Sequence, residues 1–158
     1  MAKTNKSEFI ATGTVAQNRR ARFDYNITET YIAGLVLVGT EVKSLRRGHA
    51  NITDAYGIVE DGEVYMSNMF IAAYENQGYS SHAERRNRKL LLNHREIIKI
   101  INSLQRKGST LIAIKLFFDA KGRAKLEIGL GTGKKLYDKR ETAKERDWSR
   151  EKARIMAH

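Results

Sequence analysis

Residues 110–130, TLIAIKLFFDAKGRAKLEIGL, contain two runs of strand-forming residues on either side of a short polar stretch. Residues 110–118 are rich in β-branched and aromatic side chains, and residues 124–130 resume an apolar pattern after the break. The intervening Asp119-Ala120-Lys121-Gly122 predicts a tight turn, so the whole segment is expected to be a β-hairpin.

Strand signals also occur upstream of this hairpin. Residues 9–16 alternate between apolar and polar side chains, which predicts a strand. Residues 23–38 predict one long bent strand or two strands, with Gly34 at a bend or bulge. Residues 58–66 predict a second hairpin, because Asp61-Gly62 stands between short runs of β-forming residues.

Two segments predict helices. Thr40 is a candidate N-cap for a short helix that ends at Gly48. From Asn93 onward, apolar residues recur at the spacing of one helix face, and Glu96 stands where a capping box requires it. We expect this longer helix to end at Gly108.

These elements together favour one class of fold. About six short strands with two or three helices fit a small closed β-barrel of the oligonucleotide-binding (OB-fold) type. The expected chain is therefore mainly β, with residues 1–133 as the barrel domain. An open antiparallel sheet covered by a helix is the alternative.

The composition changes after residue 133. Residues 134–158 carry nine basic and five acidic side chains, a net charge of +4, and contain no strand-forming run. Their apolar residues are too sparse to hold a helix firmly against a core. We expect residues 134–158 to be a basic tail that is disordered when free and helical when bound to a partner.

The chain as a whole is strongly basic. Its 29 Lys and Arg residues exceed its 18 Asp and Glu residues, so the formal net charge is +11. A compact basic domain most often binds a polyanion, usually nucleic acid. The absence of cysteine excludes a disulfide framework and a thiolate metal site, and fits a cytoplasmic location. No apolar stretch reaches the ~20 residues of a membrane-spanning helix.

No sequence pattern indicates an enzyme. Residues 129–134, GLGTGK, lack the leading glycine and the following Ser or Thr of a phosphate-binding loop. The four histidines have no metal-ligand spacing, and no nucleophile-elbow sequence is present. We therefore expect no catalytic residues, no metal and no cofactor.

Three basic clusters are candidate phosphate contacts, because arginine binds phosphate bidentately and stacks on bases. They are Asn18, Arg19, Arg20 and Arg22, continuing to the aromatic Phe23 and Tyr25; Lys43, Arg46 and Arg47; and Arg85, Arg86, Asn87, Arg88 and Lys89. A solvated loop is the alternative for any one cluster. Three clusters in a chain of net charge +11 favour an RNA partner instead.

Four strings occur in the order and at the spacing of a known family. They are NRRARFDY (residues 18–25), GTEVKSLR (39–46), RKLLL (88–92) and GKKLYDKR (133–140). Over nearly its whole length, the chain resembles the bacterial transfer-messenger-RNA-binding proteins, the small protein B or SsrA-binding protein family.

The resemblance implies an RNA-binding factor of trans-translation that catalyses no bond chemistry. Such a factor binds the transfer-RNA-like domain of transfer-messenger RNA (tmRNA) and delivers it to a stalled ribosome. Its tail is implied to sense the empty messenger channel, which leads to ribosome rescue and tagging of the nascent peptide. The implied partners are tmRNA and the decoding centre and messenger channel of the small ribosomal subunit. Elongation factor Tu with the aminoacylated RNA is a further candidate, and no membrane is implied.

The resemblance also implies roles for individual residues, at the positions that match the family's motifs. Asn18 and Leu92 match family residues in RNA binding, and the second string adds Glu41 to Lys43 and Arg46. The tail residues implied to act on the ribosome are Lys134, Lys135, Tyr137, Asp138, Lys139, Arg140, Arg146, Trp148, Lys152 and Arg154. Ile32 departs from the family, because many members have an RNA-binding glutamate there. Either the interface differs locally, or a neighbour such as Glu29 substitutes.

The residues alone leave two other functions open. A general single-strand-binding or RNA-chaperone barrel would bind many RNAs with strong salt dependence. A nuclease is disfavoured by the missing catalytic constellation.

Overall fold

The computed structural model describes residues 9–74, 81–134 and 136–156, with only the backbone for residues 136–139 and 142. These ranges contain nine strands and four helices. The strands are β1 (Gly13–Gln17), β2 (Tyr25–Leu35), β3 (Ala50–Asn51), β4 (Tyr56–Glu60), β5 (Glu63–Ser67), β6 (Phe70–Ile71), β7 (Arg88–Leu91), β8 (Ser109–Phe118) and β9 (Ala124–Gly133). The helices are α1 (Ala21–Asp24), α2 (Gly39–Arg46), α3 (His94–Leu104) and α4 (Leu136–Met156).

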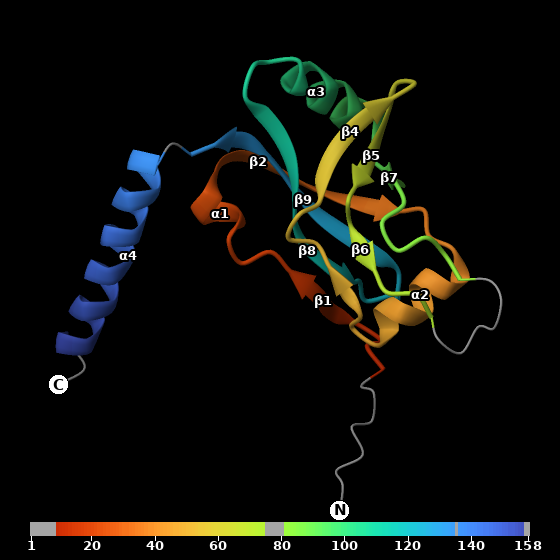
Figure 1. The fold of residues 1–158 in the computed structure, drawn as a ribbon, viewed down its shortest axis with the longest axis horizontal. Coiled ribbons are helices and arrows are strands. Elements are labelled where there is room, and N and C mark those ends of the chain that lie inside the picture. The colour runs from red at the N-terminus through yellow and green to blue at the C-terminus, as the bar shows by residue number, and fades with distance from the viewer. Residues whose placement is uncertain (1–8, 75–80, 135, 157–158) are drawn as a thin grey trace, which may run out of the picture.

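The strands form a large antiparallel sheet (Figure 1). Seven of them are hydrogen-bonded in the order β1-β8-β4-β5-β7-β2-β9, while β3 and β6 make a separate pair. β8 also pairs with β9, so the run of pairings from β8 through β4, β5, β7, β2 and β9 returns to β8. The prediction of a mainly β chain is confirmed.

The hairpin predicted from residues 110–130 is present as β8 and β9. Asp119 stabilises its turn, because its carboxylate accepts hydrogen bonds from the backbone N–H of Lys121 at 3.0 Å and of Arg123 at 2.8 Å. These bonds hold the pKa of Asp119 below its ordinary value, with the Arg123 backbone bond as the main cause. Gly122 has φ = +75°, a conformation that glycine adopts without strain.

The second predicted hairpin is present as β4 and β5. Its turn residues Asp61 and Gly62 have φ values of +49° and +75°. Two successive positive φ angles are what a two-residue type I′ turn requires, and Asp-Gly is a preferred sequence for it. The local sequence therefore determines both the turn and the register of this hairpin.

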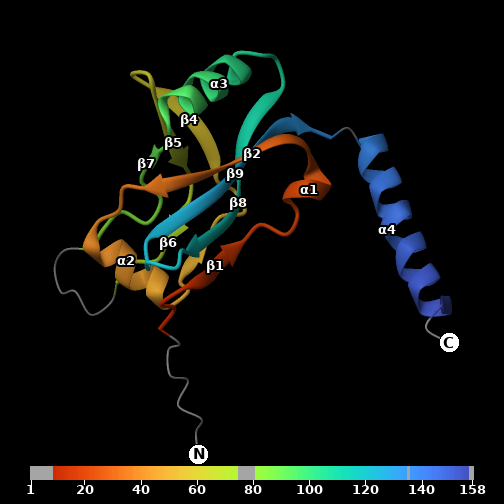
Figure 2. The same ribbon diagram turned by 180° about the vertical axis from the view of Figure 1, so that it is seen from behind.

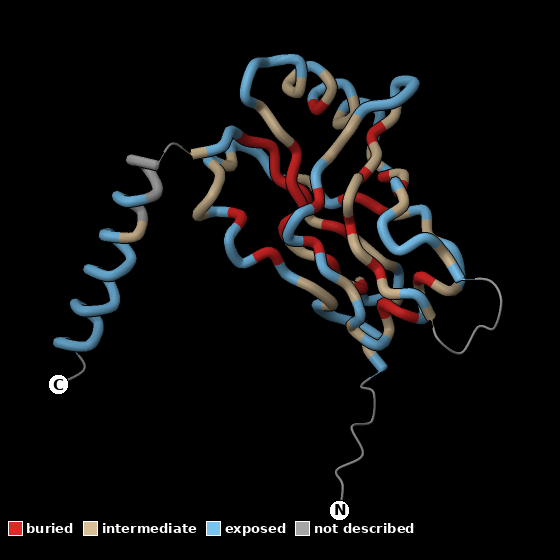
Figure 3. Tube along the Cα trace, in the orientation of Figure 1, coloured by how far each residue is buried: buried red, intermediate tan, exposed pale blue. Residues whose placement is uncertain are grey.

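The hydrophobic core lies among the strands (Figure 3). Its fully buried side chains include Leu111 and Leu116 from β8, Leu126 and Ile128 from β9, and Ile100 from α3. Burial of each such side chain contributes about 1.5–3 kcal/mol relative to exposure. α3 contacts β5 and β8 and so covers part of the sheet.

Helix α3 begins as predicted and ends earlier. The Glu96 carboxylate accepts a hydrogen bond from the Asn93 backbone N–H at 3.1 Å, as in the predicted capping box. The last helical residue is Leu104, and not a residue next to Gly108. Gly108 instead has φ = +83° in the turn before β8.

The N-terminal strands differ from their predicted bounds. β1 begins at Gly13 and not at residue 9. Phe23 belongs to the one-turn helix α1, because the backbone N–H of Phe23 donates to the Arg20 carbonyl at 3.0 Å. Gly34 is no bulge: it pairs regularly with Leu91, and a Cβ there would lie 3.1 Å from the Leu91 Cβ. The glycine thus permits the close approach of β7.

Helix α2 starts from Val38 and not from Thr40. The Val38 backbone N–H donates to the Glu41 carboxylate at 2.9 Å, which makes Val38 the N-cap. Thr40 lies inside the first turn, and its hydroxyl contacts His82 Nδ1 at 2.9 Å. The sequence placed the cap two residues late because Glu41, and not a hydroxyl, satisfies the helix start.

Glu41 is the centre of a buried ion-pair network. Its carboxylate accepts hydrogen bonds from the guanidinium groups of Arg86 and Arg88, and both Glu41 and Arg88 are 0% exposed. Arg88 also donates to the backbone carbonyls of Met69 and Glu84. Burial on its own would raise the pKa of Glu41, but the bonds from Arg86, Val38 and Arg88 outweigh it and lower that pKa.

Helix α4 stands apart from the sheet and lies near α1 (Figures 1 and 2). Its described side chains are exposed, apart from Ala143. Within the described ranges, no helix is both long and apolar enough to cross a membrane. Disorder of the tail in the free protein stays a prediction.

We expect Glu41→Gln to lower the free energy of unfolding by about 3–5 kcal/mol, because Arg88 would keep a buried charge without its anion. Glu63→Gln is the control, because Glu63 and Lys89 form a half-exposed pair at 4.0 Å whose loss costs about 1 kcal/mol or less. Urea unfolding at pH 7 measures both values. Equal losses would show that the Glu41 network is not a major source of stability.

The same network predicts an acid transition. The pKa of Glu41 is lower in the fold than its ordinary value of 4.5, so its stabilisation is complete above pH 4.5 and disappears as the pH falls through the folded-state pKa. As the pH falls from 4.5 through the folded-state pKa, the wild type should therefore lose more stability than Glu41→Gln. Parallel pH curves for the two proteins would contradict this assignment.

Candidate nucleic-acid interface

Strand β2 separates two of the predicted basic clusters. It is 11 residues long, follows α1 directly and leads into α2. At 3.2–3.4 Å per residue, its two ends lie roughly 33 Å apart. The cations near α1 and those on α2 therefore form two surfaces and not one. We call them the α1 cluster (Asn18, Arg19, Arg20, Arg22 and Tyr25) and the α2 cluster (Phe9, Lys43, Arg46, Arg47 and Tyr74).

Three arginines of the α1 cluster are on the surface. Arg19, Arg20 and Arg22 are all exposed. Arg20 makes a 3.5 Å ion pair with Asp24, and its guanidinium lies 5.2 Å from the centroid of the Phe23 ring. These side chains have the access that a phosphate contact requires.

The other two members of the α1 cluster are more enclosed. Asn18 is only 7% exposed, and its amide donates to the Ala113 carbonyl at 3.2 Å. Its backbone N–H donates to the Ile114 carbonyl at 2.8 Å, so Asn18 fixes the turn before α1 to β8. Tyr25 is half-buried against the small apolar cluster of Ala21 and Ile114. Both residues place the arginines, and a direct RNA contact by either stays a prediction.

The third predicted basic cluster differs in exposure along its length: Arg85 is exposed, Arg86 and Lys89 are half-buried, and Arg88 is buried. Arg88 has no exposed surface, and its guanidinium is used by Glu41 and by backbone carbonyls. Lys89, the next residue, is half-buried and lies 4.0 Å from Glu63. Glu41 is equally buried. Neither Glu41 nor Arg88 reaches the surface, so their effect on RNA binding would act through the fold.

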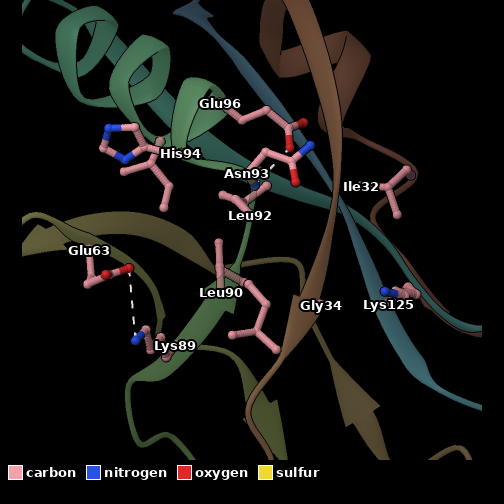
Figure 4. Close-up of a pocket in the computed structure, with 12 residues that line it drawn as sticks. Ile32, Gly34, Glu63, Lys89, Leu90, Leu92, Asn93, His94, Glu96 and Lys125 are labelled. Carbon is pink, nitrogen blue, oxygen red and sulfur yellow. Dashed lines mark hydrogen bonds and ion pairs between the residues drawn. The ribbon is translucent and has the colours of Figure 1, made fainter.

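A pocket of about 620 Å³ lies between β2, β7 and the start of α3 (Figure 4). We call it the β2–α3 pocket. Its walls include Ile32 and Gly34 from β2, Lys89 from β7, Asn93 before α3, and Lys125 from β9. It therefore combines apolar side chains with two lysines and two glutamates, Glu63 and Glu96.

The pocket contains residues that the sequence interpretation missed. Leu92 is half-buried and packs against the core, whereas Leu91 is 52% exposed next to Ile32, which is 53% exposed. Lys125 lines the same pocket from β9. The alternation of side chains along a strand would have distinguished Leu91 from its buried neighbour Leu90. No local pattern connects Lys125 with β2.

Glu29, the proposed substitute for a carboxylate at position 32, has a partner of its own. Its carboxylate accepts a hydrogen bond from the Tyr31 hydroxyl. Burial, together with this bond and the negative charge of Glu29, raises the pKa of Tyr31 to about 12. The phenol is therefore a hydrogen-bond donor at neutral pH.

In the tail, the structure places some predicted residues and leaves others out. Lys135 lies outside the described residues, as do the side chains of Tyr137, Asp138 and Lys139. Lys134 is half-buried, and its backbone N–H donates to the Asp24 carbonyl at 2.8 Å. Five of the predicted tail residues have side chains that are described and exposed: Arg140, Arg146, Trp148, Lys152 and Arg154.

The tail side chain of Arg146 contacts helix α1 beside the α1 cluster. The Arg146 guanidinium lies 5.2 Å from the centroid of the Phe23 ring, the ring that Arg20 also contacts. Trp148 is 67% exposed. Within the described ranges, no group of three or more His, Cys, Asp or Glu side chains is placed to hold a metal ion.

Comparison with known proteins identifies relatives over most of the chain. The family model described as "SmpB protein" matches residues 15–158. The "SsrA-binding protein" of Caulobacter vibrioides is 56% identical over 142 residues, covering 90% of this chain and 93% of that protein. The "SsrA-binding protein" of Mesorhizobium japonicum is 54% identical over 143 residues, covering 90% of each chain.

A solved structure gives a similar fold. It is described as "tmRNA-SmpB: a journey to the center of the bacterial ribosome", and one of its chains is 45% identical with a TM-score of 0.65. The match covers 80% of this chain and 86% of that chain.

We expect the double variant Arg19→Gln/Arg22→Gln to weaken binding of a structured RNA. Removal of two exposed phosphate contacts should reduce the slope of log K against log salt by roughly 1.4–1.8. Fluorescence titrations between 50 and 300 mM salt measure this slope. Arg106→Gln/Lys107→Gln removes the same charge from the exposed turn before β8 and should leave the slope nearly unchanged. An equal change in both variants would mean that only net charge matters.

Proposed function

We propose that this chain, which belongs to the SmpB protein family, is a tmRNA-binding factor that acts in trans-translation on the ribosome. One observation carries this function: the family match spans residues 15–158, so it includes both the α1 cluster and the tail. Three exposed arginines at the α1 cluster supply the phosphate contacts. The protein binds RNA and does not act as an enzyme.

The RNA-binding body is proposed to be a closed barrel of the OB-fold type formed by residues 1–133. The return of the strand pairings to β8 supports closure. Closure leaves β2, β7 and β9 side by side, because β2 pairs with both other strands. That placement puts the β2–α3 pocket on the outside of the barrel.

The tail, residues 134–158, is proposed to act on the ribosome and not on tmRNA. Its net charge of +4 lies in a segment that follows the last strand of the body. The described side chains of α4 are nearly all exposed. A helix with an exposed basic surface is suited to a channel lined by RNA phosphates. In this account, α4 senses the empty messenger channel near the decoding centre, and the free tail unfolds.

Delivery of the RNA completes the proposal. The tRNA-like domain of tmRNA is bound by the body and carried to the stalled ribosome, with elongation factor Tu bound to the aminoacylated RNA. The nascent peptide is then tagged. These events place the protein in the cytoplasm.

A general RNA-chaperone function is the competing account. Sequencing of the RNAs that copurify with the protein distinguishes the two. One dominant structured RNA supports the tmRNA function, whereas a broad mixture contradicts it.

Deletion of residues 134–158 should separate the two activities. We expect affinity for the tRNA-like domain to fall less than threefold, because the α1 cluster stays intact, while peptide tagging on stalled ribosomes is lost. Gel-shift titration and a tagging assay on a messenger without a stop codon measure the two effects. Loss of RNA binding on truncation would contradict the division between body and tail.

The triple variant Asp138→Ala/Lys139→Ala/Arg140→Ala should act like the deletion. Peptidyl transfer to alanyl-tmRNA is expected to fall at least tenfold, with RNA affinity unchanged. Lys144→Ala/Asp147→Ala/Arg150→Ala, on the same helix, removes the same one acidic and two basic side chains and is the matched control. Equal loss in the control would show that the assay responds to tail charge in general.

A further inference from the structure

The α2 cluster carries positive charge that no described residue neutralises. Its five residues, Phe9, Lys43, Arg46, Arg47 and Tyr74, line a cavity of about 200 Å³, and none of these described lining residues is acidic. Within the described ranges, its three cations take part in no ion pair. Surface charge without compensation favours an anionic partner.

Arg46 is the fixed part of the cluster. Its guanidinium donates to the carbonyls of Ile10 and Ala11, both at 2.7 Å, and to the carbonyl of Gly122 at 2.8 Å. It also lies 3.7 Å from the centroid of the Phe118 ring. With three carbonyls and a ring as partners, Arg46 builds the site and is not a mobile phosphate contact.

The other four side chains supply surfaces for a ligand. Phe9 is 69% exposed, and the Arg46 guanidinium beneath it lies 5.2 Å from the centroid of its ring. Lys43 Nζ and Arg47 Cζ lie 5.4 Å and 5.1 Å from the centroid of the Tyr74 ring. Arg47 Nη2 is 3.4 Å from the Tyr74 hydroxyl. Two rings next to two exposed cations match what an unpaired nucleotide offers, a flat base and a phosphate.

Building on the proposed RNA-binding function, we propose that the α2 cluster is a separate site for one unpaired RNA nucleotide. The base stacks on Phe9 and Tyr74, and the phosphate is bound by Lys43 and Arg47. A double helix offers no free base face, whereas an unpaired nucleotide presents a base face and a phosphate together. The site lies at the far end of β2 from the α1 cluster, so a bound RNA would either span both ends or contact the protein twice.

The test uses the full-length protein and two RNA probes. One is a fluorescent single-stranded RNA of eight nucleotides, and the other is a blunt RNA duplex with the same number of phosphates. Phe9→Ala/Tyr74→Ala should weaken binding of the single strand about fivefold or more and leave the duplex within twofold. Lys43→Gln/Arg47→Gln should flatten the salt slope for the single strand by roughly 1.4.

Two controls make the outcomes decisive. Arg106→Gln/Lys107→Gln removes the same charge elsewhere and should change single-strand binding less than twofold. Polyphosphate, which has no bases, should compete equally with the wild type and with Phe9→Ala/Tyr74→Ala. Equal weakening of single strand and duplex, or a change no larger than in the charge control, overturns the site.

The same variants separate this site from the proposed function. If the wild type binds the tRNA-like domain of tmRNA tightly and both α2 variants bind single strands normally, the site is wrong and the function survives. If the wild type itself shows no preference for that domain over other structured RNAs, the proposed function fails. Selective loss of single-strand binding would still support the α2 site.

Discussion

The buried ion pairs of Glu41 with Arg86 and Arg88 are the interaction on which the rest of the structure depends. They join the start of α2 to the segment before β7 and to β7 itself. Because β7 pairs with β2 and α2 follows β2, the network fixes one whole end of the sheet. Removal of either Glu41 or Arg88 leaves its partner charged and without solvent.

The basic residues of the body are of two kinds. Arg88 and Arg46 are held by carboxylate or carbonyl oxygens and therefore maintain the fold. Arg19, Arg22 and Lys43 are exposed and available to phosphates. The net charge of +11 thus overstates the charge free to bind RNA. Exposed cations lie at both ends of β2, on the tail, on α3 and in the turn before β8.

The sequence predicted those features that short-range chemistry determines. Asp61-Gly62 and the pair Asn93 and Glu96 act within four residues, so the β4–β5 turn and the start of α3 were predictable. The burial of Arg88 was not, because it depends on Glu41, which is 47 residues away. Leu91 is exposed because side chains alternate along β7, a strand that the sequence interpretation did not predict. Long-range pairing decides which predicted site residues reach the surface.

The central claim is that body and tail contact different RNAs, and tethered cleavage tests it most directly. The chain contains no cysteine, so Asn26→Cys on β2 and Ser149→Cys on α4 each give one attachment point for an iron chelate. Both positions are exposed. In complexes of tmRNA with stalled ribosomes, position 26 should cleave tmRNA and position 149 should cleave small-subunit ribosomal RNA. Cleavage of the same RNA from both positions would contradict the account.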